Sequence, residues 1–511
     1  MLVLLYDSHF SGVHIREEFS SSSPVKNFPV VKPQAVRDFF FLSILTCAAV
    51  LVQGYHVGIE DMAVYMPAIK KIINPELYPY DSNFFFLYTR WTLYHRTVAG
   101  LVRASHLPIE WTLFALHILS VFLILLACFQ LIRRCFHERA SQWCGVAFVA
   151  ALLTMPVAGT ALFVADQHLH PRNFATAFLL FGAVAALERR PIALVWIVIT
   201  ALCHPTMAMY GTFHIVILAC GSFSAQPTAA FVAIPFGTPP NPIWRKAMAD
   251  RGYPYPFSWA WYEWLGALAP IAFLEYFARI GRREGMALFE RVCHRLAIST
   301  SLGIVGAVFV SEYLQTQTQT WVRFEPMRIL QFPYVVFLLF SGGMLGKYLL
   351  RDRALRWAAL FIPLALAMFY FQRLEFPSSY HIEWPGRPPR NSWVQAFVWA
   401  RENTPHSAFF ALDPRYMHIP GEDYYGFRAF AERSALADNE KDTSTVAVFP
   451  DLAWQWNLEV TDRENWTQFT LADFEHLKKK YGVTWVIVAR PGVSDLSCPY
   501  SNTQVMVCQI P

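Results

Sequence analysis

Apolar residues in this chain come in long blocks that short polar stretches separate. A typical block is FFFLSILTCAAVLVQ, which ends at Gln53. A run of about 20 apolar residues is long enough to cross the roughly 30 Å hydrocarbon core of a bilayer as a helix. The pattern therefore predicts an all-α polytopic membrane domain with about 11 transmembrane helices.

The predicted spans are 38–56, 109–132, 143–165, 172–187, 191–203, 206–221, 224–237, 259–279, 293–312, 328–348 and 355–372. Between 190 and 237 the blocks are short and are broken by Pro205, Pro227 and Pro235. Nine crossings are therefore the alternative to eleven.

Basic residues cluster in four of the connections between spans, and they predict the orientation of the chain. The clusters are Arg133 to Arg139, Arg189 and Arg190, Arg279 to Arg283, and Lys347 to Arg356. Loops rich in Lys and Arg stay on the cytoplasmic side. We therefore expect a multi-pass protein of the cytoplasmic (inner) membrane, with a cytoplasmic segment 1–37, a transmembrane domain 38–372 and a large first outer loop 57–108.

The composition changes after residue 372. Residues 373–391 form a Pro-rich linker, and 392–511 alternate helical patterns such as TLADFEHLKKKYGV with strand patterns such as TWVIVARP. The orientation given above places this small α/β domain outside the cytoplasm. Cys498 and Cys508 flank a turn near its end, and in an oxidising compartment we expect them to form a disulfide; two free thiols on neighbouring strands are the alternative.

The overall composition excludes one class of function. The chain is 55% hydrophobic and only 15% charged, and its net charge of +5 is spread over 42 basic and 37 acidic residues. Nucleic-acid grooves use basic runs with interleaved aromatic residues, and the sequence has no such run. We expect membrane lipid, and no nucleic acid, among its partners.

Unusual polar residues collect in the connections that are predicted to lie outside. Ionisable residues near membrane depth are costly and tend to mark functional sites. The candidates are Glu60 and Asp61 after the first span, Asp166, His168, His170 and Arg172 in DQHLHPRN, His204 in CHPTM, and Arg323, Glu325 and Arg328 in WVRFEPMRI.

These residue types suit transfer of a group from an anionic lipid. Arginine binds phosphate oxygens in a bidentate manner, and a carboxylate can accept the proton of an attacking hydroxyl group. Since the phosphate leaves with its own negative charge, nearby Arg and His side chains can stabilise it without a separate acid.

The acidic pair in GIEDMAVYMPAI, the long first outer loop, the later His/Arg motifs and the outer α/β domain together resemble the GT-C superfamily. These are polytopic glycosyltransferases that use polyprenyl-phosphate-linked sugars, and the protein mannosyltransferases are among them. The resemblance covers most of the chain as architecture and little more than GIEDMAVYMPAI as motif. It implies that Asp61 or Glu60 is the catalytic carboxylate of an inverting enzyme with a polyprenyl-phosphate sugar as donor. The family motif is often Asp-Asp or Asp-Glu, and here it is Glu-Asp, so which of the two acts stays open.

Other interpretations remain for these residues. Asp61 and Glu60 could cap the following helix. His168, His170 and His204 could line the site or simply satisfy backbone groups, and Arg323 and Arg328 could bind phosphate or anchor the chain at the interface. No cofactor is predicted, although a divalent metal bound by His168 and His170 is an alternative. The chain could also be a transporter or flippase of an anionic lipid-linked solute, or a non-catalytic assembly factor, and the acceptor is unknown.

Overall fold

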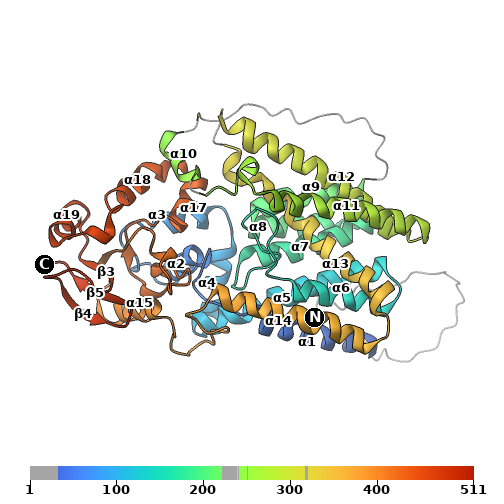
Figure 1. Cartoon of the computed structure of the whole chain (residues 1–511), viewed down its shortest axis with the longest axis horizontal. Helices are drawn as coiled ribbons and strands as arrows, with labels where there is room; N and C mark the ends of the chain where they lie inside the picture. Colours follow the sequence, from blue (N-terminus) through green and yellow to red (C-terminus); the bar gives the residue numbers. More distant parts are fainter. Residues whose placement is uncertain (1–32, 221–238, 240, 250, 317–319) are drawn as a thin grey trace, which may run out of the picture.

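The computed structural model describes residues 33–220, 239, 241–249, 251–316 and 320–511. It consists of a helical bundle and a C-terminal domain that lie at opposite ends of the long axis (Figure 1). The predicted span 224–237 and most of the predicted cytoplasmic segment 1–37 lie outside the described residues.

Within the described residues, five stretches of helix are long and apolar enough to cross a membrane. They are Pro33–Gln53 (α1), Ile109–Cys135 (α5), Ala287–Tyr313 (α12 and its continuation), Pro326–Leu350 (with α13, Gln331–Leu345, at its centre) and Ala354–Glu375 (α14). Three shorter apolar helices accompany them, α7 (Pro171–Leu187), α8 (Ile192–Cys203) and α9 (Pro205–Ala219), together with α6 (Arg139–Ala151) and α11 (Trp261–Arg283). Apolar side chains on the outer surfaces of α1, α8 and α14, such as Phe40, Leu194 and Leu366, are more than half exposed. Such a surface is typical of a multi-pass membrane protein, and the number of eleven crossings stays a prediction.

One predicted span is wrong in its second half. The span 143–165 was expected to be a single helix, but α6 ends at Ala151 and residues 152–170 form an irregular segment. Proline has no N–H to donate and disfavours a helix interior, and Pro156 instead pairs with Phe163 in an antiparallel bridge. Gly159, between these two residues, lies so close to the ring of Trp259 that a Cβ atom would come within 2.6 Å of it. The irregular segment leads the polar residues 166–170 into the interior of the protein.

The first outer loop folds into helices between the bundle and the C-terminal domain (Figure 1). They are α2 (Met62–Ile73), α3 (Asn83–Phe86) and α4 (Tyr94–Ser105). The apolar face of α2, with Met62, Met66 and Ile69, packs against residues of α4 and α5. This face is therefore covered by protein.

The C-terminal domain contains a mixed five-stranded sheet with the strand order β2-β1-β3-β5-β4. Strands β1 (Phe409–Ala411) and β2 (Ser434–Ala435) are parallel, as are β1 and β3, whereas β3 (Trp485–Ala489) and β4 (Ser497–Ser501) each run antiparallel to β5 (Val505–Gln509). The helices of this domain are α15 (Ser392–Asn403), α16 (Phe427–Ala431), α17 (Lys441–Val448), α18 (Ala453–Thr461) and α19 (Leu471–Tyr481). Helix α10 (Pro242–Ala249), from the connection before α11, packs against α17 and α18. Cys498 on β4 and Cys508 on β5 are joined by a disulfide.

The two parts of the molecule are joined by backbone pairing around the first outer loop. Tyr55 pairs with Ile382 and Ile59 pairs with Tyr425, and the N–H of Gly426 donates to the carbonyl of Gly58 at 2.9 Å. A Cβ atom on Gly426 would lie 2.4 Å from that of Ala63, so only glycine permits this approach. The segment 54–61 is thereby fixed between the bundle and the C-terminal domain.

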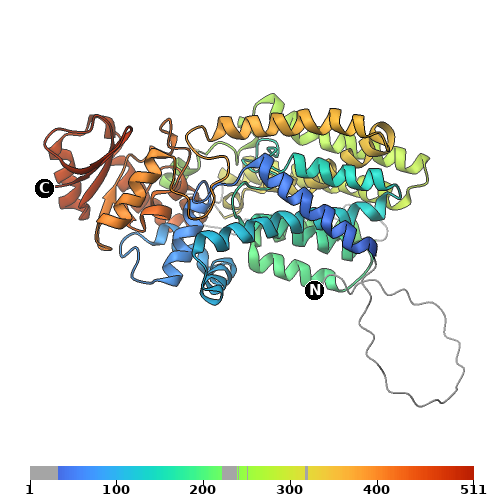
Figure 2. The same cartoon turned by 90° about the horizontal axis from the view of Figure 1, so that it is seen from below.

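The predicted cytoplasmic loops meet at one end of the bundle. The Lys347 ammonium lies 3.2 Å from Glu138 and 2.9 Å from Glu284, which joins three of the four connections. The C-terminal domain lies at the other end, as both views show (Figures 1 and 2). This separation agrees with basic loops on one side of a membrane and the C-terminal domain on the other; the direction in which the protein faces stays a prediction.

Candidate active site

Asp61 is the first residue before α2, but its side chain does not cap this helix. No cap hydrogen bond links the carboxylate to the first turn of α2. Instead, Asp61 Oδ2 lies 3.1 Å from His170 Nε2, and Asp61 Oδ1 lies 3.7 Å from Lys441 Nζ. Helix capping therefore does not account for this carboxylate, one third of which is exposed.

The contacts of His170 determine which of its nitrogens carries the proton. Nδ1 accepts a hydrogen bond of 2.9 Å from the backbone N–H of Arg172, because His170 caps α7 and Pro171 occupies the first helical position. Nε2 therefore bears the hydrogen and donates it to Asp61. Burial and the charge of Arg172 lower the pKa of His170, so the ring is neutral and the carboxylate is the charged partner.

Asp61 is held in its ionised form. Burial by itself would raise the pKa of Asp61, but the hydrogen bond from His170 and the charges of Lys441 and Arg172 bring it well below the usual range of a carboxyl group. The group is therefore an anion throughout the physiological pH range.

Arg172 lies behind this pair and is almost completely buried. Its Nη2 donates to Asp166 Oδ1 at 2.6 Å, and Asn173 holds the backbone of Asp166 in place at 3.1 Å. Arg172 Nε and Nη1 have no hydrogen-bond partner within the described ranges, and neither have the two ring nitrogens of His168. Unpaired buried N–H groups are costly, so two guanidinium donors are available for an anion.

A second group of charges, around Arg328, lies within electrostatic reach of Asp61. Arg328 forms an ion pair with Glu325, and Glu325 also accepts from Arg251 and from Tyr253, each at 2.9 Å. The His204 ring lies 6.0 Å from the His170 ring. Burial and the charges of Arg172 and Arg328 lower the pKa of His204, so His204 lies in the electrostatic environment of both arginines.

Arg323 is not part of this arrangement. Its Nε donates to the carbonyl of Thr320 at 3.1 Å, and its guanidinium lies 4.9 Å from the centre of the Phe324 ring and 5.9 Å from that of Trp91. The geometry favours the anchoring interpretation of Arg323 over phosphate binding.

Lys441 is a site residue that sequence analysis did not identify. It belongs to α17 in the C-terminal domain, is buried, and forms an ion pair with Glu60 in addition to its contact with Asp61. Burial by itself would lower the pKa of Lys441, but the charges of Glu60 and Asp61 raise it. Glu60, with a positive φ of 48°, is held at its backbone by Tyr424 and contacts Lys441 rather than His170. The stretch ADNEKD reads like an exposed charged segment, so only the fold reveals the role of Lys441.

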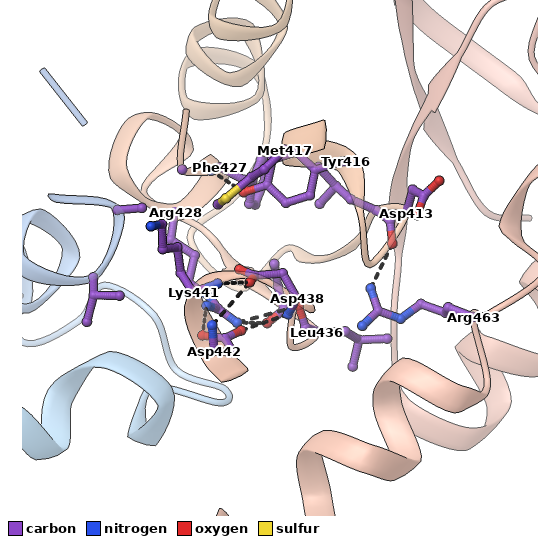
Figure 3. Close-up of a pocket in the computed structure, with 15 residues that line it drawn as sticks. Asp413, Tyr416, Met417, Phe427, Arg428, Leu436, Asp438, Lys441, Asp442 and Arg463 are labelled. Carbon is purple, nitrogen blue, oxygen red and sulfur yellow. Dashed lines mark hydrogen bonds and ion pairs between the residues drawn. The ribbon is translucent and has the colours of Figure 1, made fainter. Parts of the chain in front are cut away.

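A small cavity lies beside Lys441, which is one of the residues that line it (Figure 3). Arg428, Asp438, Asp442 and Arg463 line it, and its volume of about 10 Å³ is that of roughly one water molecule. Arg428 Nη1 donates to Asp442 Oδ1 at 2.8 Å. This buried network supports Lys441, and it is too small for a substrate.

The residues at the site do not fit a divalent metal bound by the histidines. Both nitrogens of His170 are engaged, one by the Arg172 N–H and one by Asp61. Across the described part of the chain, no three His, Cys, Asp or Glu side chains gather as metal ligands would.

No protein-family model matches the sequence, and no curated protein matches it. Among solved structures, the chain is similar to the Archaeoglobus fulgidus oligosaccharyltransferase tethered with an acceptor peptide containing the NVT sequon. The TM-score is 0.43 and the sequence identity is 13%, over 90% of this chain and 69% of the other. At this level of similarity, a function has to be argued from the residues of this chain.

Proposed function

We propose that this protein is a membrane glycosyltransferase that moves a sugar from a polyprenyl-phosphate-linked donor to an acceptor outside the cytoplasmic membrane. The observation that supports this most directly is the pairing of two features. An ionised and accessible carboxylate, Asp61, shares one electrostatic environment with the buried guanidinium of Arg172, two of whose donors have no partner in the described residues.

In the proposed reaction, a hydroxyl group of the acceptor attacks the anomeric carbon of the sugar. The new C–O bond forms as the bond between this carbon and the phosphate oxygen breaks, and the phosphate keeps the electron pair. The hydroxyl proton passes to Asp61. Because the attacking oxygen becomes strongly acidic as it bonds to carbon, a carboxylate with a lowered pKa is basic enough to accept this proton.

Arg172 and Arg328 are the proposed phosphate ligands. The Nε and Nη1 N–H groups of Arg172 have no partner in the described residues, and each can donate a hydrogen bond to a phosphate oxygen. Arg328 adds a second positive charge, and His168 and His204 line the same region. Asp166 orients Arg172, and His170 fixes the direction of the Asp61 carboxylate.

The contacts also support a division of roles between the two acids. Asp61 accepts from His170 and is influenced by Arg172, whereas the side chain of Glu60 contacts only Lys441 in the described structure. We therefore assign the base to Asp61 and a positioning role to Glu60, which holds Lys441 beside it.

The test is incubation of the purified protein with a panel of radiolabelled polyprenyl-phosphate sugars, followed by measurement of hydrolysis or transfer. Loss of a general base typically lowers the rate by about 10²- to 10⁴-fold. We expect Asp61→Asn to lower turnover by that order while donor binding and thermal stability are retained, and we expect a milder effect of Glu60→Gln.

The alternatives give different results in the same assay. A transporter or flippase would bind the donor without turnover in any variant, and an assembly factor would be insensitive to Asp61→Asn. If Glu60→Gln is inactive and Asp61→Asn is active, the roles are exchanged. If both variants keep full turnover, the catalytic assignment of this pair is refuted.

A further inference from the structure

Tyr65 lies one helical turn after Asp61 on α2, and residues four apart share one face of a helix. Its ring is held by four aromatic neighbours from three other segments. The ring centres lie 5.1 Å from His170, 5.3 Å from His95, 5.9 Å from Tyr94 and 6.2 Å from Tyr88. Such edge contacts fix the orientation of an aromatic ring.

Tyr65 differs from these neighbours in two ways. It is partly exposed, whereas Tyr94, His95 and His170 are buried. Its hydroxyl group makes no hydrogen bond to any residue that the structure describes, whereas the hydroxyl of Tyr88 donates to the carbonyl of Ser444 at 3.3 Å. A rigidly held and accessible phenol without a protein partner is suited to contact a ligand.

The charges around Tyr65 place it at the centre of the site. Burial raises the pKa of Tyr65, the charge of Asp61 adds to this, and the charges of Arg172 and Arg328 oppose it. Tyr65 is therefore within electrostatic reach of the proposed base and of both proposed phosphate ligands. In the proposed reaction, the group between the base and the phosphate is the sugar.

We propose that Tyr65 forms the binding subsite for the sugar that is transferred, with its hydroxyl group hydrogen-bonded to a hydroxyl of a hexose ring. This inference rests on the proposed function. Tyr65 would then help to determine which sugar the site accepts. A sugar without the matching hydroxyl would leave the Tyr65 hydroxyl unpaired, and a site rejects ligands that leave its polar groups unpaired.

The experiment measures the affinity of the full-length, detergent-solubilised protein for two probes, bare polyprenyl phosphate and polyprenyl-phosphate hexose. The variants are Tyr65→Phe and, as a matched control, Tyr94→Phe. Tyr94 belongs to the same aromatic cluster, and its buried hydroxyl also has no partner in the described residues. Thermal unfolding is measured for each variant to verify that it is folded.

We expect Tyr65→Phe to weaken binding of the hexose-bearing probe by roughly 3- to 10-fold, the range of one hydrogen bond, with unchanged binding of bare polyprenyl phosphate. Tyr94→Phe should change neither affinity. Equal weakening of both probes by Tyr65→Phe, or no weakening of either, overturns the sugar subsite and leaves the proposed function in place. If the unmodified protein binds neither probe, the proposed function fails, and this inference fails with it.

Discussion

Replacement of Lys441 by Met tests whether the C-terminal domain sets the ionisation of the proposed base. Lys441 is buried, contacts Glu60, and lies 3.7 Å from Asp61. Methionine fills a similar volume and lacks the charge. Since the charge of Lys441 helps to lower the pKa of Asp61, we expect the pKa of Asp61 to rise in this variant and the acid limb of the pH profile of kcat/KM to move to higher pH.

The distance gives the magnitude. Two unit charges about 4 Å apart attract each other by about 1 kcal/mol in bulk water and by about 4 kcal/mol near a protein surface. Because one third of the Asp61 side chain is exposed, we expect the lower value, about 1 kcal/mol. That energy changes the ratio of protonated to ionised Asp61 by roughly fivefold at a given acid pH.

The same contact predicts how stability depends on pH. A carboxyl group whose pKa is lowered on folding stabilises the protein above the ordinary carboxyl range, and this contribution is lost as pH falls through the lowered value. Lys441→Met should therefore lower the free energy of unfolding by about 1–2 kcal/mol at neutral pH, and the difference from the unmodified protein should shrink in acid.

The assay is sugar transfer measured from pH 8 down to the lowest pH at which the unmodified protein stays folded, together with thermal unfolding at each pH. Lys480→Met is the matched control, because Lys480 pairs with Asp462 on the surface of the same domain. The acid limb of the kcat/KM profile of Lys480→Met should coincide with that of the unmodified protein. A folded Lys441→Met variant with an unshifted acid limb would show that this lysine does not act on Asp61.

Two further predictions concern the buried network and the orientation. Arg428→Met leaves the buried carboxylate of Asp442 without its partner, so this variant should lose about 3–5 kcal/mol of unfolding free energy. Lys480→Met, at the surface, should lose at most about 1 kcal/mol. Equal losses in thermal unfolding would contradict the burial of the Arg428–Asp442 pair. A reporter that is active only outside the cytoplasm should be active when fused after Ile510, and activity of a cytoplasmic reporter there would move the whole proposed site to the other side of the membrane.

The sequence predicts the part of the candidate site in which ionisable residues stand next to apolar spans. Asp61, His170 and Arg172 stand out because ionisable groups are rare near membrane spans, and the structure brings them together although 109 residues separate Asp61 from His170. The same reasoning cannot separate the two interpretations of Arg323. In the sequence, a basic residue near the interface gives the same signal whether it binds a ligand or packs on an aromatic ring such as that of Trp91.

Other features could not be predicted because they depend on contacts between distant segments. Lys441 lies in a polar stretch of a polar domain, where a charged residue gives no signal. Tyr65 has the helical spacing of a core residue, and only the four rings around it distinguish it from Met62 and Met66. The break after Ala151 depends on Pro156 and on the packing of Gly159 against Trp259, inside a block that is apolar enough to be one helix.

The backbone pairing of Tyr55 with Ile382 and of Ile59 with Tyr425 has a consequence for synthesis of the protein. Residues 54–61 leave the ribosome more than 300 residues before their partners do. Until then, Glu60 and Asp61 lack Lys441, and the segment that carries them has no strand to pair with. The site is thus among the last parts of the molecule to form, and a chain that stops before the C-terminal domain would lack the ion pair of Lys441 with Glu60 and its contact with Asp61.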